Sequence, residues 1–192
     1  MTKQDFDSEN LYREWLQVEK NLSEKMQSGL RWIKENDSDA VIIGAMAVAN
    51  YLLIPRKLTP DVDFLSANIE KVKIKLEESL ISFRPLYNSI GITVEKFNLD
   101  LLDSEEGNKK LNAFALSNYR FIKVAGVVVR MVTVEALTIM KFSSGREKDE
   151  ADAFNLLKSG AINKEKFQRE IKRFGKHIPN QEDLIRYSEI IS

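Results

Sequence analysis

Two stretches of the sequence decide its fold: residues 41–47 read VIIGAMA, and residues 56–63 read RKLTPDVD. The β-branched run before Gly44 is typical of a buried strand, and the pattern after it predicts a helix. A basic loop follows. Polar and apolar residues then alternate, which predicts a strand with Asp61 and Asp63 on one face. We therefore expect a strand, a glycine turn, a helix and a second strand that presents two carboxylates.

The rest of the chain divides into helical and strand patterns. Strand patterns lie at 92–97 and 99–102, as one bent strand or two, and at 121–131 as a hairpin that turns at Gly126. Helical patterns lie at 8–36, 45–53, 68–80, 109–116, 134–142, 148–158, 164–174 and 181–191. These patterns predict an α/β (α+β) protein, in which a mixed sheet is flanked by helices. We expect a core at 1–132, which includes the N-terminal helix, and a helical C-terminal region at 133–192.

The residue types limit which sites the chain can build. The 192 residues include no cysteine and one histidine, so disulfides, thiolate zinc sites and histidine-rich metal clusters are excluded. A bound metal must therefore be held by oxygen, which favours magnesium, manganese or calcium. Basic and acidic residues both number 29, so the net charge indicates no overall attraction to nucleic acid.

Nothing in the sequence predicts a membrane location. No stretch is long and apolar enough to span a bilayer. The polar, acidic residues 1–7 do not have the pattern of a signal peptide. We expect a cytoplasmic protein without a membrane partner.

The glycine turn and the two aspartates suit phosphate and metal chemistry. Gly44 has no Cβ, so backbone can approach a phosphate closely, and the helix that follows offers free N–H groups. Two carboxylates at i and i+2 on a strand repel each other unless a cation lies between them. Divalent ions can bridge such carboxylates and a triphosphate. Two simpler interpretations stay open: Asp61 and Asp63 are solvated residues of an edge strand, and Gly44 is a turn glycine without a ligand.

Residues 41–157 resemble the nucleotidyltransferase superfamily, specifically the stand-alone bacterial group that includes AbiEii-like toxins. The similarity lies in the strand, the small-residue turn, the helix and the segment at 56–63. A later aspartate follows in NLDLL at 98–102, and a lysine-containing helix with downstream charged residues begins near 134. The resemblance implies the nucleotidyltransferase fold.

The resemblance also implies roles for individual residues. Asp61, Asp63 and Asp100 would be the catalytic carboxylates and would hold Mg²⁺ or Mn²⁺. Nucleotide contacts would come from Gly44, Ala45, Arg56, Lys57, Thr59, Lys141, Lys148 and Asp149. The implied activity moves a nucleoside monophosphate from an NTP such as ATP to a hydroxyl of RNA, protein or a small molecule. The group further implies a toxin role and an antitoxin partner.

Several of these residues have alternative roles. Asp103 competes with Asp100 as the third carboxylate, and either Arg56 or Lys57 can serve as the basic residue before the pair. Lys141 can also be an ordinary surface lysine that contacts no ligand. Ala45 lacks the hydroxyl that a serine would offer to phosphate, which favours a second function, a catalytically degenerate module that binds a nucleotide or a protein.

Two charged segments have structural alternatives of their own. Arg146, Lys148, Asp149 and Asp152 can form a structural salt-bridge cluster. The basic helix at 164–176 can be a solvated face or an RNA-contacting surface.

Overall fold

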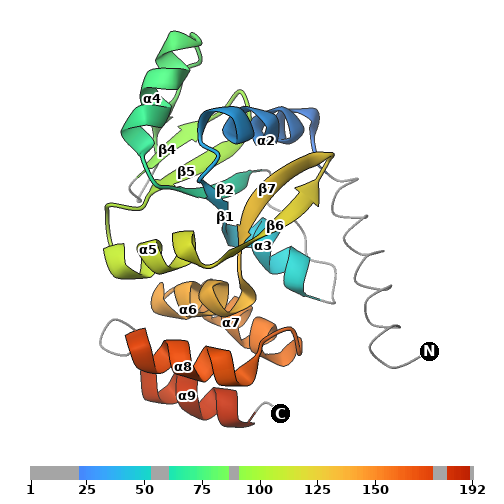
Figure 1. Cartoon of the computed structure of the whole chain (residues 1–192), viewed down its shortest axis with the longest axis vertical. Helices are drawn as coiled ribbons and strands as arrows, with labels where there is room; N and C mark the ends of the chain where they lie inside the picture. Colours follow the sequence, from blue (N-terminus) through green and yellow to red (C-terminus); the bar gives the residue numbers. More distant parts are fainter. Residues whose placement is uncertain (1–21, 53–60, 87–90, 175–180, 191–192) are drawn as a thin grey trace, which may run out of the picture.

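The structure is a computed structural model that describes residues 22–52, 61–86, 91–174 and 181–190 (Figure 1). Its strands are β1 Val41–Ile42, β2 Val62–Ser66, β3 Arg84–Pro85, β4 Gly91–Val94, β5 Leu99–Asp103, β6 Tyr119–Val124 and β7 Val127–Val132. Its helices are α2 Glu24–Asn36, α3 Gly44–Tyr51, α4 Ile69–Glu78, α5 Lys109–Ser117, α6 Val134–Ser143, α7 Glu147–Lys158, α8 Lys164–Phe174 and α9 Gln181–Ile190.

The seven strands form one mixed sheet in the order β3-β4-β5-β2-β1-β7-β6. The pairs β2/β5 and β1/β7 are parallel, and all other neighbouring pairs are antiparallel. This confirms the predicted mixed sheet with flanking helices and a helical C-terminal extension. β2 lies between β5 and β1, so the interpretation of Asp61 and Asp63 as edge-strand residues is wrong.

Two hairpins shape the sheet. Residues 95–98 form a tight turn between β4 and β5, with Asn98 in the left-handed region at φ 50°, so the pattern at 92–102 forms two antiparallel strands. The hairpin predicted at 121–131 is confirmed, and its turn places both Ala125 and Gly126 at positive φ. Positive φ at both central residues matches the twist of the strands that such a turn joins.

The two faces of β2, β4 and β5 differ in chemistry because paired residues share a face. One face is apolar and buried, and consists of Val62, Phe64, Ile92, Val94, Leu99 and Leu101. α2 covers this face so closely that a Cβ on Gly29 would lie 2.8 Å from Leu99 Cδ2. The opposite face carries the polar residues described below.

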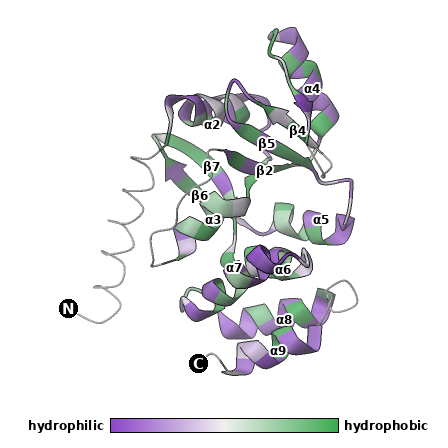
Figure 2. Ribbon diagram, turned by 180° about the vertical axis from the view of Figure 1, so that it is seen from behind, coloured by the Kyte–Doolittle hydropathy of each residue, from purple (hydrophilic) through white to green (hydrophobic). Residues whose placement is uncertain are grey.

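The helices after the last strand pack on α3 and α5 and on one another. α6 contacts α3, α5, α7 and α8, and α9 packs on α8. Figure 1 shows α6 to α9 gathered at the end of the molecule away from α4. Figure 2 shows that α8 and α9 carry many hydrophilic residues, whereas the strands are mostly hydrophobic.

The structure corrects several predicted boundaries. Asp61 precedes β2 instead of lying within it, and α3 begins at Gly44 and ends at Tyr51. The two-residue strand β3 was not predicted, because neither two residues nor a proline makes a strand pattern. Thr133 occupies the N-cap of α6, but its hydroxyl makes no capping hydrogen bond.

Some predictions fall outside the described residues. These are the part of the first predicted helix before Leu22 and the nucleotide-binding roles of Arg56, Lys57 and Thr59. Within the described part of the chain, no helix is long and apolar enough to cross a membrane.

Candidate functional site

A polar row crosses four neighbouring strands on the face opposite α2. The register places Arg84 of β3 opposite Thr93 of β4, Thr93 opposite Asp100 of β5, and Asp100 opposite Asp63 of β2. Asp61 stands just before β2, and its carboxyl lies within hydrogen-bonding reach of Asp100. The structure thus brings together Asp61, Asp63 and Asp100, which come from two distant parts of the chain.

The start of α3 lies directly against Asp63. Gly44 has φ 65°, and a Cβ built on it would lie 1.9 Å from Asp63 Oδ2. The backbone N–H of Ala45 donates a hydrogen bond to the Asp63 carboxylate. The helix N-terminus expected to meet a phosphate therefore also holds one of the three carboxylates. Gly44 is required here both by its backbone conformation and by the space that Asp63 occupies.

Asp63 lies in an environment that disfavours its charge. Burial, followed by the charges of Asp61 and Asp100, raises the pKa of Asp63 to about 6. The Ala45 N–H and the charge of Lys141 act in the opposite direction but do not outweigh them. The positive charge that reaches Asp63 from Lys141 is therefore too small to offset burial and the two neighbouring carboxylates.

Asp100 is half-buried and held by a neighbour on β4. The Thr93 hydroxyl donates to Asp100 Oδ1 at 2.7 Å. Burial raises the pKa of Asp100, the Thr93 hydrogen bond lowers it, and the nearby Asp61 raises it further, so that the net shift is upward.

Asp103, the competing third carboxylate, lies elsewhere. It pairs in register with Ser66, and its Oδ1 accepts the Glu105 N–H at 2.9 Å. Asp100 is therefore the carboxylate that accompanies Asp63.

Lys141 of α6 belongs to a buried ion-pair cluster with α7. Its Nζ lies 2.5 Å from Asp149 Oδ1 and 3.4 Å from Asp152 Oδ2, and Arg146 also pairs with Asp149. Burial acts to raise the pKa of Asp149, but the hydrogen bonds from Lys141 and Ser144 and the charges of Lys141 and Arg146 lower it overall. Lys148 is exposed on α7. Lys141 is thus held in place by α7 while its charge reaches Asp63.

The chemistry of the carboxylate cluster fits a hard divalent cation. All its donors are oxygen atoms, and the pKa of Asp63 is raised first by burial and then by the negative charges of Asp61 and Asp100. The carboxyls of Asp61 and Asp100 lie within hydrogen-bonding reach of each other, so a single cation could contact both. Among the described residues, no three acidic or histidine side chains already surround one point as metal ligands do. The residues that would hold such a cation are Asp61, Asp63 and Asp100.

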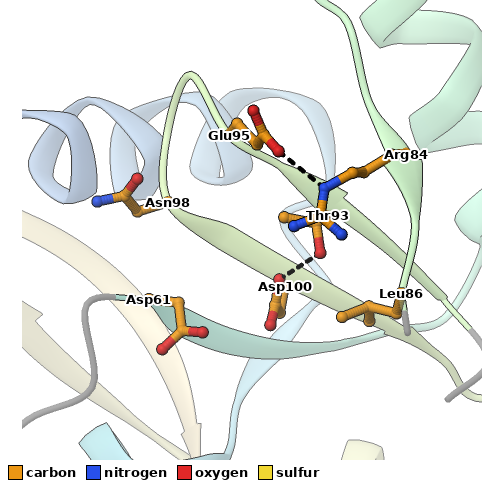
Figure 3. Close-up of a pocket in the computed structure, with 7 residues that line it drawn as sticks. All are labelled: Asp61, Arg84, Leu86, Thr93, Glu95, Asn98 and Asp100. Carbon is orange, nitrogen blue, oxygen red and sulfur yellow. Dashed lines mark hydrogen bonds and ion pairs between the residues drawn. The ribbon is translucent and has the colours of Figure 1, made fainter. Parts of the chain in front are cut away.

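A cavity of about 410 Å³ lies beside Asp100, and Figure 3 shows the side chains around it. Four of its polar lining residues were not predicted from the sequence: Arg84, Thr93, Glu95 and Asn98. The sequence signal that could have indicated Thr93 and Glu95 is the alternation of apolar and polar residues at 92–95, which is typical of two side chains on one face. Only the hairpin register places Thr93 opposite Asp100.

Comparisons with known proteins show that the fold of this chain is similar to that of a solved structure. No profile of a known protein family matches the chain, and no curated protein matches it. Among solved structures, the chain is similar to an antigenic nucleotidyltransferase-like protein from Paracoccidioides brasiliensis, with a TM-score of 0.55 and 14% sequence identity over 92% of this chain and 93% of that chain. At this identity the similarity concerns the fold alone. The chain therefore has a nucleotidyltransferase-like fold.

Proposed function

We propose that the chain is a metal-dependent nucleotidyltransferase that moves a nucleoside monophosphate from an NTP to a hydroxyl group. The observation that carries this proposal is the meeting of Asp61, Asp63 and Asp100 at the start of α3, within a nucleotidyltransferase-like fold. A half-buried group of like charges is costly to maintain, and such groups cluster at functional sites.

In this proposal each group has a defined task. Asp61, Asp63 and Asp100 hold Mg²⁺ or Mn²⁺, which when bound supplies positive charge to the triphosphate and to the departing pyrophosphate. Asp100 accepts the proton of the attacking hydroxyl, and the 2.7 Å hydrogen bond from Thr93 fixes its orientation.

The nucleotide is proposed to bind on the α3 and α6 side of the cluster. The backbone at Gly44 and Ala45 lies at a helix N-terminus, where free N–H groups favour phosphate. Lys141 adds positive charge there, held by Asp149 at 2.5 Å. We propose Arg56, Lys57, Thr59 and Lys148 as further nucleotide contacts.

Nucleotide transfer should depend on the aspartate pair. Purified chain incubated with each labelled NTP, Mg²⁺ and cell extract should label an acceptor. The double variant Asp61→Ala and Asp63→Ala should reduce labelling by at least about 100-fold, because metal ligands supply several kcal/mol of transition-state stabilisation. Gel and chromatographic detection of the transferred label measures the effect.

A matched variant and a binding measurement complete this experiment. Asp103→Asn changes a half-buried aspartate of the same sheet outside the cluster, so it should leave labelling intact. If calorimetry detects Mg²⁺-dependent NTP binding but no label is transferred with any extract, the chain is the degenerate binding module instead. If neither binding nor transfer occurs, both proposals fail.

We further propose that the chain belongs to the AbiEii-like group and acts as a toxin, on the basis of the sequence resemblance over residues 41–157. Induced expression in bacteria should slow growth, since uncontrolled nucleotide transfer would modify a cellular target. The Asp61→Ala and Asp63→Ala double variant, expressed at the same level, should restore normal growth. Equal growth inhibition by both proteins would contradict the toxin role.

A further inference from the structure

The two edges of the sheet differ in how readily they can accept another strand. β3 ends the sheet on one side with two residues, and one of them is Pro85, which has no N–H. β6 ends it on the other side (Figure 1), and each residue from Tyr119 to Val124 pairs in regular register with β7. Short length and proline protect an edge from pairing with another chain, whereas a long regular strand does not. β6 is therefore the open edge of the described sheet.

The backbone of β6 directs hydrogen-bonding groups away from β7. In an antiparallel pair, alternate residues bond to the partner strand, and the residues between them face outward. The Thr133 N–H donates to the Asn118 carbonyl at 2.8 Å, and this bond sets the phase of the alternation. The N–H and C=O groups of Tyr119, Phe121 and Lys123 thus face the open edge. Within the described part of the chain, none of these backbone groups has a hydrogen-bond partner.

The side chains of β6 leave this edge poorly protected. Phe121 is 61% exposed, and a large apolar side chain on an open edge favours association. Arg120 is turned onto α3, where its guanidinium bonds to Asn50 and lies over the Tyr51 ring. Lys123 is the only other charged residue of the strand. One lysine therefore remains to discourage pairing with another chain.

The edge is complementary to a second copy of itself. In an antiparallel pair centred on Phe121, the two Phe121 side chains lie opposite each other, and Tyr119 of one copy lies opposite Lys123 of the other. An aromatic pair and an ammonium over a tyrosine ring are both favourable contacts. Arg120 lies opposite Ile122, so no like charges face each other directly. The outward backbone groups of the two strands are also in phase, so they can all pair.

We propose that the chain forms a symmetric dimer in solution, in which the β6 edges of two copies pair antiparallel about Phe121 and join their sheets. Such a contact uses the same surface of both copies. Two six-residue edges form a small interface, so the association should be reversible. β1 and β7 separate β6 from β2, which carries Asp63, so the inference does not depend on the proposed function.

The mass of the full chain in solution tests the dimer. Sedimentation equilibrium should give a mass that rises with concentration toward twice 22.1 kDa. Phe121→Glu should raise the dimer dissociation constant at least about 30-fold, because two carboxylates would lie opposite each other and the aromatic pair would be lost. Circular dichroism should show an unchanged fold, since this side chain is exposed. The matched control is Ile74→Glu, which places the same charge at a 53% exposed position on α4 and should leave the dimer intact.

An engineered disulfide tests the register, because the chain has no cysteine of its own. Residues opposite each other in a hydrogen-bonded antiparallel pair have Cα atoms about 5.5 Å apart, a separation that a disulfide can bridge. Phe121→Cys should therefore form a covalent dimer under mild oxidation. Ile74→Cys is equally new to the surface but lies outside the edge, so it should not.

Three results would overturn the inference: a monomer at hundreds of micromolar, a dimer that persists unchanged in Phe121→Glu, or equal cross-linking of the two cysteine variants. A stable complex of this edge with an acidic strand of another protein, in place of the dimer, would also overturn it. Nucleotide transfer per chain should be the same in Phe121→Glu and in the unmodified protein. Absence of transfer from both would contradict the proposed function and leave the dimer unaffected.

Discussion

Asp63→Asn should abolish nucleotide transfer and at the same time make the protein more stable at neutral pH. The folded chain holds the Asp63 carboxylate largely out of solvent, and this partial burial and the charges of Asp61 and Asp100 raise its pKa to about 6 from 3.8. An asparagine keeps an oxygen for the Ala45 N–H and removes the buried like charge. We expect a gain of about 2 kcal/mol in the free energy of unfolding, or roughly 5 °C in Tm. Transfer should fall by about 1000-fold.

The stability difference should depend on pH in a defined direction. Because the folded-state pKa of Asp63 is raised, protonation favours the folded state, and this contribution is lost as pH rises through about 6. The advantage of Asp63→Asn over the unmodified chain should therefore be full at pH 7 and shrink as pH falls from about 6 toward 4. Denaturant unfolding across this range measures it. Asp103→Asn, on the neighbouring strand, is the control and should show neither the gain in stability nor the loss of transfer. A lower stability of Asp63→Asn at pH 7 would contradict the unfavourable charge inferred for Asp63.

Gly44→Ala should strongly destabilise the chain. The new Cβ would lie 1.9 Å from Asp63 Oδ2, and the residue would keep a φ of 65° that L side chains rarely adopt. Left-handed strain and overpacking together cost about 3 kcal/mol or more. The β1–α3 turn and Asp63 must both shift, so transfer should be lost with stability. Denaturant unfolding and the labelling assay measure the two effects.

Gly145→Ala separates strain from steric conflict. Gly145 has nearly the same φ, 67°, but nothing lies within 4 Å of the position that an added Cβ would occupy. It should cost only the conformational part, about 1 kcal/mol. The excess cost at Gly44 should shrink when Asp63 is also replaced by alanine, because the carboxyl is removed and only the Cβ at 2.8 Å remains in conflict. A double-mutant cycle detects this coupling. Equal costs at the two glycines would show that Asp63 does not confine Gly44.

The sequence predicted the elements of the candidate site better than their contacts. The strand, glycine turn and helix at 41–51 follow from local patterns, and so does the presence of a carboxylate pair at Asp61 and Asp63. Local patterns do not contain the register between strands. Asp100 and Asp103 therefore remained competing candidates until the pairing of β2 with β5 placed Asp100 opposite Asp63.

Contacts between distant elements were the least predictable. Lys141 pairs with Asp149 and Asp152 because α7 packs on α6. The spacing of these residues in the sequence does not predict that packing. The contact between Gly44 and Asp63 likewise depends on the antiparallel pairing of β1 with β2. The local pattern around Gly44 indicates a phosphate-binding turn, but it contains no sign of the carboxylate that borders this glycine.

The central position of β1 has a consequence for how the protein is made. Val41 pairs with Leu65 on one side and with Arg130 on the other, so β1 gains its second neighbour only when a strand about 90 residues later is available. Pairings over such sequence separations are slow to form. A chain still emerging from the ribosome presents an unpaired edge of β1 until β7 has been synthesised, and such edges are prone to association with other chains. Synthesis of the second half of the molecule is therefore the interval in which this protein is most exposed to aggregation.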